Sequence, residues 1–324
     1  MRIGHFNVRL NTFECLNVAL SGQVQTFTGR LPASCLKQLG AKLINAQSCF
    51  RRQINVIGSA VTASRCWSSR RKVDLVPYVQ QNHAMRKLDG TIEGFNVDMA
   101  MEIGKRLKRP VNIEGTQFSG LIPGLNAKKY DWIAAPTTVT PQRAEQMLFT
   151  EGYLDTDFQF LVKKSDAEIN SLDDLKGKTI SVNKGSAYEA WAKDNMAKYS
   201  FKYDIYDTNA DAVQAVLSGR AQANLAGNTV VAWAAKQNPL VKTTYTIKTG
   251  LVWAIPLRLD DKAGRTVLSN AVKCMKMDGT YARLHEKWFG SKPAADSAAV
   301  KVSPGHGVVG MPGYDPTPNT PQCS

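Results

Sequence analysis

The segment Asp131-Trp-Ile-Ala-Ala-Pro-Thr-Thr-Val-Thr-Pro-Gln-Arg143 joins a short apolar run to the start of a helix. The apolar residues at 131–135 predict a buried strand. Thr140 followed by Pro141 predicts a helix N-terminus, because the threonine side chain can cap unpaired N–H groups and proline has no N–H to leave unpaired there. Arg143 is therefore expected in the first helical turn.

This segment has the features of a carboxylate site. A loop that runs into a helix N-terminus presents unpaired backbone N–H groups and the positive end of the helix dipole. Thr137 and Thr138 add hydroxyl groups, and the planar guanidinium of Arg143 can hold both oxygens of a carboxylate. From these residues alone, the alternative is a surface ion pair of Arg143 with Glu145 or Glu151.

Several motifs along the chain occur in the order and spacing of a known family. They are Gly94-Phe-Asn-Val-Asp-Met-Ala100, Phe118-Ser-Gly-Leu-Ile-Pro-Gly-Leu125, Tyr130-Asp-Trp132 and Thr140-Pro-Gln-Arg143, followed by Asp278-Gly279 and Lys287-Trp-Phe-Gly290. Over about residues 85–290 the chain resembles the bacterial extracellular solute-binding proteins of family 3, the amino-acid-type receptors of ABC importers. The resemblance implies an α/β fold of the two-lobe, type II periplasmic-binding-protein class with two hinge crossovers.

The resemblance also suggests how the chain is divided. Lobe 1 is expected over residues 84–157 and 251–290, and lobe 2 over residues 158–250. Two crossings between the lobes make a hinge that can close around a ligand. Residues 291–324 are rich in Pro and Gly with little periodicity, so we expect a flexible tail or one that lies across the surface.

Residues 1–83 form an atypical N-terminal segment. Met1–Ser21 lacks the uninterrupted apolar core of an export signal, since Arg9 and Glu14 interrupt it. The family's first strand has its nearest candidate in Asp74–Gln80, which Pro77 interrupts. We expect a frameshift or a wrongly chosen start upstream of about His83, with disorder or a genuine divergent extension as the alternatives. A periplasmic location is expected from the family alone.

The net charge of +14 is concentrated in this same segment. Residues 1–87 carry 13 Lys and Arg against two acids, a net charge of +11, while residues 88–324 carry 28 against 25, or +3. A basic surface that binds nucleic acid would need this excess on the folded part. The sequence therefore gives little support to a nucleic-acid role.

The six cysteines predict no metal site. Four lie in the N-terminal segment without a pair at metal-ligand spacing. Cys274 and Cys323 could form a disulfide that ties the tail to the last helices, or could remain two separate thiols. We expect neither a metal nor a cofactor. No stretch is long and apolar enough to span a bilayer.

The resemblance implies a ligand site shared between the lobes. Arg143 and Thr138 would hold a carboxylate, the start of a lobe 2 helix would close over it, and Phe118 would cover the ligand's aliphatic part, with simple core packing as its alternative role. The expected contacts are Phe118, Pro136, Thr138, Arg143, Ser186, Ala187 and Asn228.

The chain departs from the family at two positions. Gly152 stands in Phe149-Thr-Glu-Gly-Tyr153 where proline is usual. More importantly, amino-acid receptors usually place an Asp after the strand at 221–226 to neutralise the ligand's ammonium, and here Gly227 and Asn228 stand there. Asparagine accepts a hydrogen bond but cannot cancel a charge. Either an acid elsewhere serves, or the ligand lacks an α-ammonium.

Three functions remain open from the sequence. The preferred one is the substrate-binding component of an ABC-type importer, which takes an amino acid or related small carboxylate to importer membrane subunits. We expect this protein to be a monomer and not an enzyme. The second is a dehydratase-like enzyme on the same scaffold, which would need a general acid or base, whereas His5, His83, His285 and His306 lie outside the expected cleft. The third is a non-functional remnant that lacks its first strand.

Overall fold

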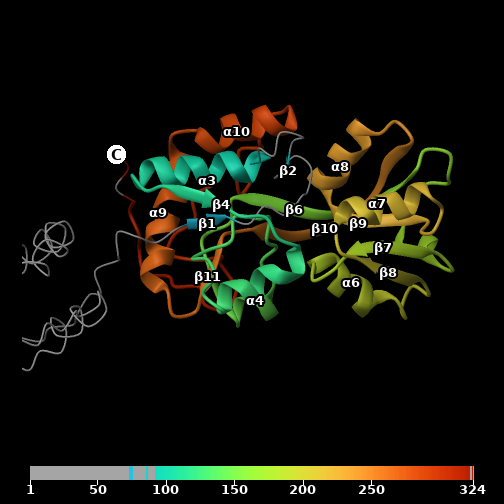
Figure 1. The fold of residues 1–324 in the computed structure, drawn as a ribbon, viewed down its shortest axis with the longest axis horizontal. Helices are drawn as coiled ribbons and strands as arrows, with labels where there is room; N and C mark the ends of the chain where they lie inside the picture. The colour runs from blue at the N-terminus through green and yellow to red at the C-terminus, as the bar shows by residue number, and fades with distance from the viewer. Residues whose placement is uncertain (1–72, 76–84, 87–91, 322, 324) are drawn as a thin grey trace, which may run out of the picture. The chain divides into compact units, whose positions relative to one another are not determined.

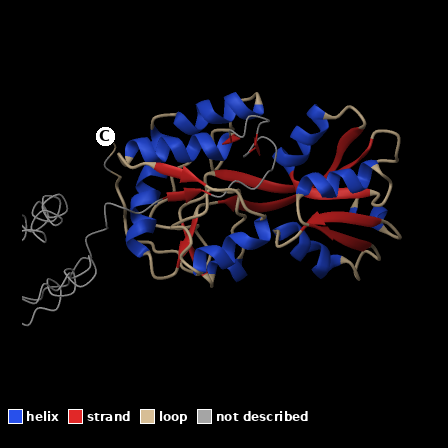
Figure 2. Ribbon diagram, viewed as in Figure 1, coloured by secondary structure: helices blue, strands red, loops and turns tan. Residues whose placement is uncertain are grey.

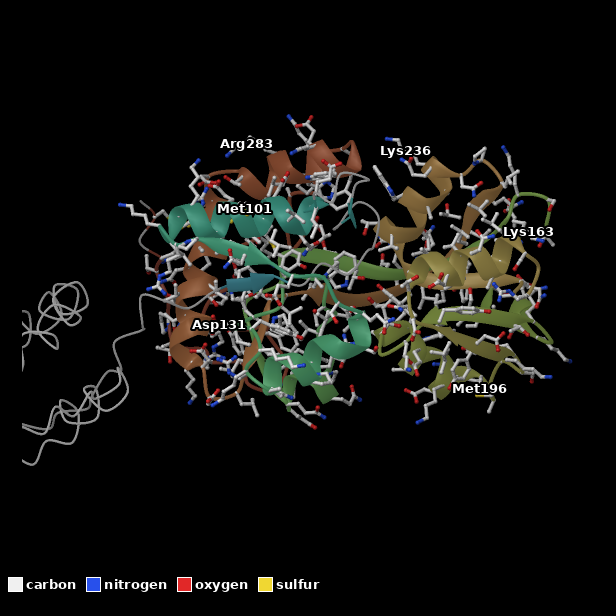
Figure 3. All side chains as sticks on the ribbon, viewed as in Figure 1. Met101, Asp131, Lys163, Met196, Lys236 and Arg283 are labelled. Atoms are coloured by element: carbon white, nitrogen blue, oxygen red, sulfur yellow. A yellow bond between two sulfur atoms is a disulfide. The ribbon has the colours of Figure 1, made fainter. Side chains whose placement is uncertain are left out.

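Two long paired strands connect the two lobes of the protein. The computed structural model describes residues 73–75, 85–86, 92–321 and 323. Strands β6 (Leu154–Lys163) and β10 (Val241–Trp253) run antiparallel between the lobes (Figure 1). Figure 3 shows Lys163, the last residue of β6, in lobe 2 and Asp131 in lobe 1. These strands are the two predicted crossovers, and the two-lobe α/β fold is confirmed.

Lobe 1 combines short strands with packed helices, as Figure 2 shows. Its strands pair as β1 (Val73–Leu75) with β4 (Val111–Ile113), β2 (Met85–Arg86) with β3 (Ile92–Glu93), and β5 (Met147–Phe149) with β11 (Pro256–Arg258). Its helices are α3 (Phe95–Arg106), the 3-10 turn η1 (Phe118–Gly120), α4 (Leu121–Asn126), α5 (Pro141–Ala144), α9 (Lys262–Met277) and α10 (Thr280–Phe289).

Lobe 2 is built on a single sheet with strand order β10-β6-β9-β7-β8. Strands β7 (Thr179–Asn183), β8 (Lys202–Tyr206) and β9 (Ala223–Gly227) are parallel to one another, and β9 pairs antiparallel with β6. The helices are η2 (Leu172–Leu175), α6 (Ala187–Asn195), α7 (Asn209–Leu217) and α8 (Asn228–Gln237). Because the carboxyl ends of parallel strands meet at one edge, β7 and β9 deliver their following loops to the same side of the sheet.

The first strand of lobe 1 is present. Strand β1 pairs parallel with β4, with Val73 opposite Val111 and Leu75 opposite Ile113. It overlaps the start of the candidate segment Asp74–Gln80 and ends before Pro77. The remnant interpretation assumed that this strand was missing, so that argument for it fails. The hypotheses of a frameshift and of an unrecognised export signal concern residues 1–72 and 76–84, which lie outside the described part.

Two local expectations for lobe 1 were wrong: the strand at 131–135, and a helix cap at Asn96, which the chemistry of its side chain predicts. Residues 132–135 are buried but form no strand, and Trp132 makes only an isolated bridge to Leu257. The cap of α3 is Gly94, whereas the side-chain amide of Asn96 donates to Ala134 O at 2.5 Å and to the Tyr153 hydroxyl at 2.8 Å. The pair Asp89-Gly90 predicts a hairpin over residues 88–94. The antiparallel pairing of β2 with β3 agrees with it, and the turn at 87–91 lies outside the described residues.

Asp98 connects the motif at residues 94–100 with the motif at residues 287–290. Its carboxylate accepts from Lys287 Nζ at 2.6 Å and from Trp288 Nε1 at 2.8 Å, which fixes α10 against α3. Packing also explains the glycine at position 152, because a Cβ there would lie 2.6 Å from Val252 Cγ2. Asp98 therefore has a structural role.

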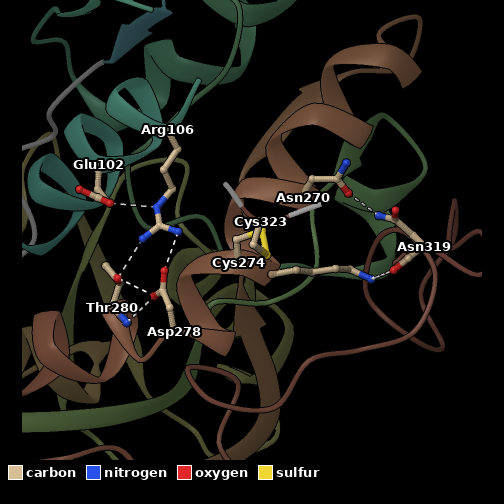
Figure 4. The surroundings of a disulfide bond; sticks show 9 residues. Glu102, Arg106, Asn270, Cys274, Asp278, Thr280, Asn319 and Cys323 are labelled. Carbon is tan, nitrogen blue, oxygen red and sulfur yellow. Dashed lines mark hydrogen bonds and ion pairs between the residues drawn. A yellow bond between two sulfur atoms is a disulfide. The ribbon is translucent and has the colours of Figure 1, made fainter. Parts of the chain in front are cut away.

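The C-terminal tail makes defined contacts with lobe 1. A disulfide joins Cys274 of α9 to Cys323, and Asn319 donates to Asn270 nearby at 2.7 Å (Figure 4). Lys273 donates to Ser303 O at 2.8 Å and to Gly305 O at 2.9 Å. These contacts favour the tail that lies across the surface over the flexible one.

A buried ion pair holds the start of the tail. Lys276 Nζ lies 3.0 Å from Glu151 Oε1, each side chain being 1% exposed, and it also donates to Gly152 O and Lys301 O. The other Glu151 oxygen accepts from Ser303 N at 2.8 Å. Burial lowers the pKa of Lys276, and the neighbouring Glu151 carboxylate opposes that shift.

None of the helices in the described ranges has both the length and the apolar character needed to cross a membrane.

We expect Glu151→Gln to lower the free energy of unfolding by about 3–5 kcal/mol, because it leaves the Lys276 charge buried without a counter-charge. Urea denaturation measures this change. Glu145→Gln is the matched control, since Glu145 is exposed. Equal stability of the two variants would show that Glu151 does not compensate the lysine.

We expect Cys274→Ser with Cys323→Ser to lower stability by about 2–4 kcal/mol, because the disulfide closes a loop between residues 49 apart. Thermal unfolding with and without a reductant checks this: the reductant should lower the Tm of the wild type and leave that of the double variant unchanged. A wild-type Tm that does not respond to the reductant contradicts a stabilising disulfide.

Candidate functional site

Arg143 lies where the sequence predicts, and its side chain spans both lobes. Thr140 caps α5 by accepting from Arg143 N at 3.3 Å. The guanidinium donates from Nη1 to Thr138 O at 2.8 Å in lobe 1 and from Nη2 to Gly185 O at 2.9 Å in lobe 2. Glu151 pairs with Lys276, and within the described ranges Arg143 makes no salt bridge. The alternative of a surface ion pair is therefore wrong within these ranges.

Arg143 carries its charge in a half-buried place. Burial lowers the pKa of Arg143 to about 10, which leaves the group charged at neutral pH. Its Cζ lies 5.7 Å from the centroid of the Phe118 ring, so this aromatic residue contacts the guanidinium as well as the core around it. A guanidinium has five N–H donors, and the two bonds to carbonyls leave three available. Arg143 can thus bridge the lobes and still hold an anion.

Thr138 contributes to the site through its backbone. Its carbonyl receives Arg143, while its hydroxyl accepts from Trp253 Nε1 at 3.1 Å. The preceding Pro136 and Thr137 are buried, and the Thr137 hydroxyl donates to Ala135 O at 2.9 Å. Trp253 is the last residue of β10, so the second crossover supports the Arg143 loop directly.

Lobe 2 approaches through the turn between β7 and α6. Gly185 has a φ of +74° and comes so close to lobe 1 that a Cβ there would lie 3.2 Å from Ser119 Cα. Ser186 caps α6: its hydroxyl donates to Asn183 O at 2.6 Å and accepts from Glu189 N at 3.1 Å. The Glu189 carboxylate accepts from Gly185 N at 2.5 Å.

The structure thus brings the loop of Arg143 and the turn of Gly185 together, but it gives the predicted contacts of lobe 2 local roles. The Ser186 hydroxyl is engaged in capping, and Ala187 is the buried first residue of α6. Asn228 begins α8, and its buried Oδ1 has no hydrogen-bond partner among the residues that the structure describes. Ligand contacts at these three residues remain predictions.

Sequence reasoning missed Tyr188. Its side chain is 4% exposed and packs edge-on against Phe158 with ring centroids 4.9 Å apart. A Cβ on Gly227 would lie 2.8 Å from its hydroxyl oxygen. The signal was the missing acid at 227, which left room for a large side chain from another element.

The site combines one half-buried cation with neutral polar groups and with the Glu189 carboxylate, which accepts from Gly185 N; the cation can bind an anion. His285 and His306 lie elsewhere, with His285 Nδ1 2.6 Å from Ser291 O in lobe 1 and His306 bridged to Asp315 in the tail. The described residues include no group of three or more His, Cys, Asp or Glu side chains that could hold a metal ion.

Comparison with known proteins agrees with this geometry. The family model of bacterial extracellular solute-binding proteins, family 3, matches residues 78–291. An ABC transporter arginine-binding protein of Escherichia coli is 30% identical over 203 residues, which cover 61% of this chain and 82% of that protein. An L-cystine-binding protein of Escherichia coli is 28% identical, covering 63% and 76%.

Solved structures with the same fold have also been found. An ancestral arginine-binding protein bound to arginine aligns with a TM-score of 0.66 and 31% identity, covering 69% of this chain and 100% of that one. An ancestral amino-acid-binding protein described as a precursor of cyclohexadienyl dehydratase aligns with a TM-score of 0.61 and 30% identity, covering 67% and 93%.

The family match covers well over half of the chain, and the two lobes, the paired crossovers and Arg143 between the lobes are all in place. The chain belongs to the bacterial extracellular solute-binding proteins, family 3.

Proposed function

We propose that the chain is the substrate-binding component of an ABC-type importer and that it holds a small, amino-acid-like carboxylate between its lobes. The observation that carries this proposal is the Arg143 guanidinium, which bonds one backbone carbonyl in each lobe. A carboxylate bound to its remaining N–H groups would be enclosed by both lobes. The arginine- and cystine-binding relatives support a ligand of this size and charge.

The same proposal includes the place of action and the partners. Receptors of this family are extracellular or periplasmic, and we propose the periplasm as the location and the membrane subunits of an importer as partners. The protein would bind its ligand without turnover. Acid–base chemistry needs a group that exchanges protons near neutral pH, and the described groups around Arg143 are backbone carbonyls, a phenyl ring and a tyrosine hydroxyl whose pKa burial raises well above its usual range.

Closure gives the carboxylate contact its strength. Water competes for hydrogen bonds in an open cleft, and its exclusion makes a charge-assisted bond worth about 1.5–3 kcal/mol net. Arg143 is held in place by Thr138 O and by the Phe118 ring, so little side-chain entropy remains to be lost on binding.

We expect Arg143→Ala to abolish detectable binding, and Arg143→Lys to weaken it by about 10- to 100-fold because an ammonium cannot form the planar fork. Isothermal titration calorimetry of the purified chain with a panel of amino acids and related carboxylates measures both. Arg220→Ala is the matched control, because Arg220 is an exposed arginine in lobe 2. Wild-type affinity in Arg143→Ala would refute the assigned carboxylate site.

We expect Ser186→Ala to lower the free energy of unfolding by about 0.5–2 kcal/mol through loss of the α6 cap, and Ser186→Thr to keep most of it. Because the hydroxyl is already bonded to Asn183 O and Glu189 N, the affinity should fall less than in Arg143→Lys. Urea denaturation and calorimetry on the same samples separate the two effects. A loss of affinity without a loss of stability would make Ser186 a direct ligand contact.

A further inference from the structure

The position that follows the strand β9 is occupied by glycine for reasons of space. Gly227 has a φ of −63° and a ψ of 142°, which any residue can adopt, so the backbone does not require glycine. A Cβ there would, however, lie 2.8 Å from the Tyr188 hydroxyl oxygen and 3.0 Å from Trp253 Cζ2. The volume that an acidic side chain would need at this position is therefore taken by Tyr188 and Trp253.

Tyr188 presents a neutral hydroxyl in that volume. Burial raises the pKa of Tyr188 well above its usual range, while the Gly227 N–H, the Arg143 guanidinium and the Thr156 hydroxyl lower it by smaller amounts. The hydroxyl therefore stays protonated at neutral pH. Because the Gly227 N–H donates toward its oxygen, the proton of the hydroxyl remains available to a ligand. Tyr188 thus offers a hydrogen-bond donor where an acid would offer a negative charge.

The aspartates on β6, the strand that pairs with β9, are bonded to groups outside this volume. On β6, Thr156 is buried, while Asp155 accepts from Ala298 N and Asp157 pairs with Lys248 at 2.7 Å. The two aspartates flank Thr156, so the alternation of a strand turns them to the opposite face of the sheet.

The remaining candidate acids are also bonded to other groups. Glu151 pairs with Lys276, and the Glu189 carboxylate accepts from Gly185 N. Within the described ranges the charge of Arg143 thus has no carboxylate in contact with it. The site would gain little from a zwitterion, whose ammonium would enter a buried place that already holds a cation and no described acid.

Asn228 adds a second neutral group beside Tyr188. Its Oδ1 is buried, and none of the described residues donates to it, which costs free energy until a donor reaches it. A hydroxyl group both donates and accepts. A ligand hydroxyl could accept from Tyr188 and donate to Asn228, whereas a carbonyl oxygen could only accept.

We propose that Tyr188 takes over the α-position of the ligand from the acidic residue of the amino-acid receptors, and that the cleft prefers a 2-hydroxycarboxylate anion to the corresponding amino acid. The inference rests on the proposed receptor function and on Arg143 as the carboxylate contact. Arg143 holds the carboxylate, Tyr188 donates to the 2-hydroxyl oxygen, and Asn228 accepts the proton of that hydroxyl.

The test compares ligands that differ only at the α-position. The purified full chain is titrated in a calorimeter at pH 7 with four pairs of equal side chain: alanine and lactate, glutamate and 2-hydroxyglutarate, phenylalanine and phenyllactate, arginine and 2-hydroxy-5-guanidinopentanoate. In any pair that binds, we expect the hydroxy acid to bind at least about 10-fold more tightly. An amino acid that binds as tightly as its hydroxy acid, or more tightly, overturns the inference.

Variants then assign the preference to Tyr188. Tyr188→Phe keeps the ring and removes the hydroxyl, and it should weaken binding of the hydroxy acid by about 3- to 10-fold. Tyr199→Phe is the matched control, since Tyr199 follows α6 and stacks near Lys198, away from Arg143. Unchanged affinity for the hydroxy acid in Tyr188→Phe overturns the role of the tyrosine.

A double variant tests the exchange directly. Gly227→Asp alone would clash with Tyr188, so it is combined with Tyr188→Ala, which makes room and supplies the acid. We expect the preference within a pair to reverse in favour of the amino acid; a double variant that folds and still prefers the hydroxy acid counts against the exchange. Binding of amino acids alone by the wild type overturns this inference and leaves the receptor function standing. Failure of all eight ligands to bind overturns both.

Discussion

The half-buried charge of Arg143 is the constraint on which the candidate site depends. A guanidinium removed from water must find hydrogen-bond acceptors, and this one finds Thr138 O in lobe 1 and Gly185 O in lobe 2. The need to satisfy the charge thus draws the two lobes together at one point. The two carbonyl bonds leave three N–H groups for an anion, which would add the counter-charge that the carbonyls lack.

The rest of the fold can be understood as support for that point. Trp253, at the end of β10, holds Thr138 through its indole N–H, so the second crossover reaches the arginine loop. The turn before α6 must carry glycine at 185, because φ is positive there and a side chain would meet Ser119. Hinge bending at β6 and β10 would break the hydrogen bond from Arg143 to Gly185 O, so in the proposed receptor this bond would couple ligand binding to closure.

Local sequence signals predicted what local physics decides. The cap at Thr140 follows from side-chain chemistry and is present, while the two crossovers, which the family resemblance implied, are also present. The start of α3 was misplaced because Asn96 has the chemistry of a cap. Its amide instead bonds Ala134 O and the Tyr153 hydroxyl, contacts 38 and 57 residues away that no local pattern can reveal.

The candidate site shows the same difference between features that the sequence predicts and contacts between distant residues. Arg143 and Phe118 both belong to lobe 1: the helix start at Thr140-Pro141 pointed to Arg143, and the family resemblance added Phe118. Tyr188 and Gly227 are 39 residues apart, on different elements that meet only because the parallel strands β7 and β9 end at one edge of the sheet. The absence of an acid at 227 was visible in the sequence, but its physical reason was not. The backbone at Gly227 does not require glycine, so the absence of a side chain there indicates that another group fills the space. That group is the neutral hydroxyl of Tyr188, near Arg143. A neutral hydroxyl leaves the surroundings of Arg143 with more positive charge than an acid at position 227 would.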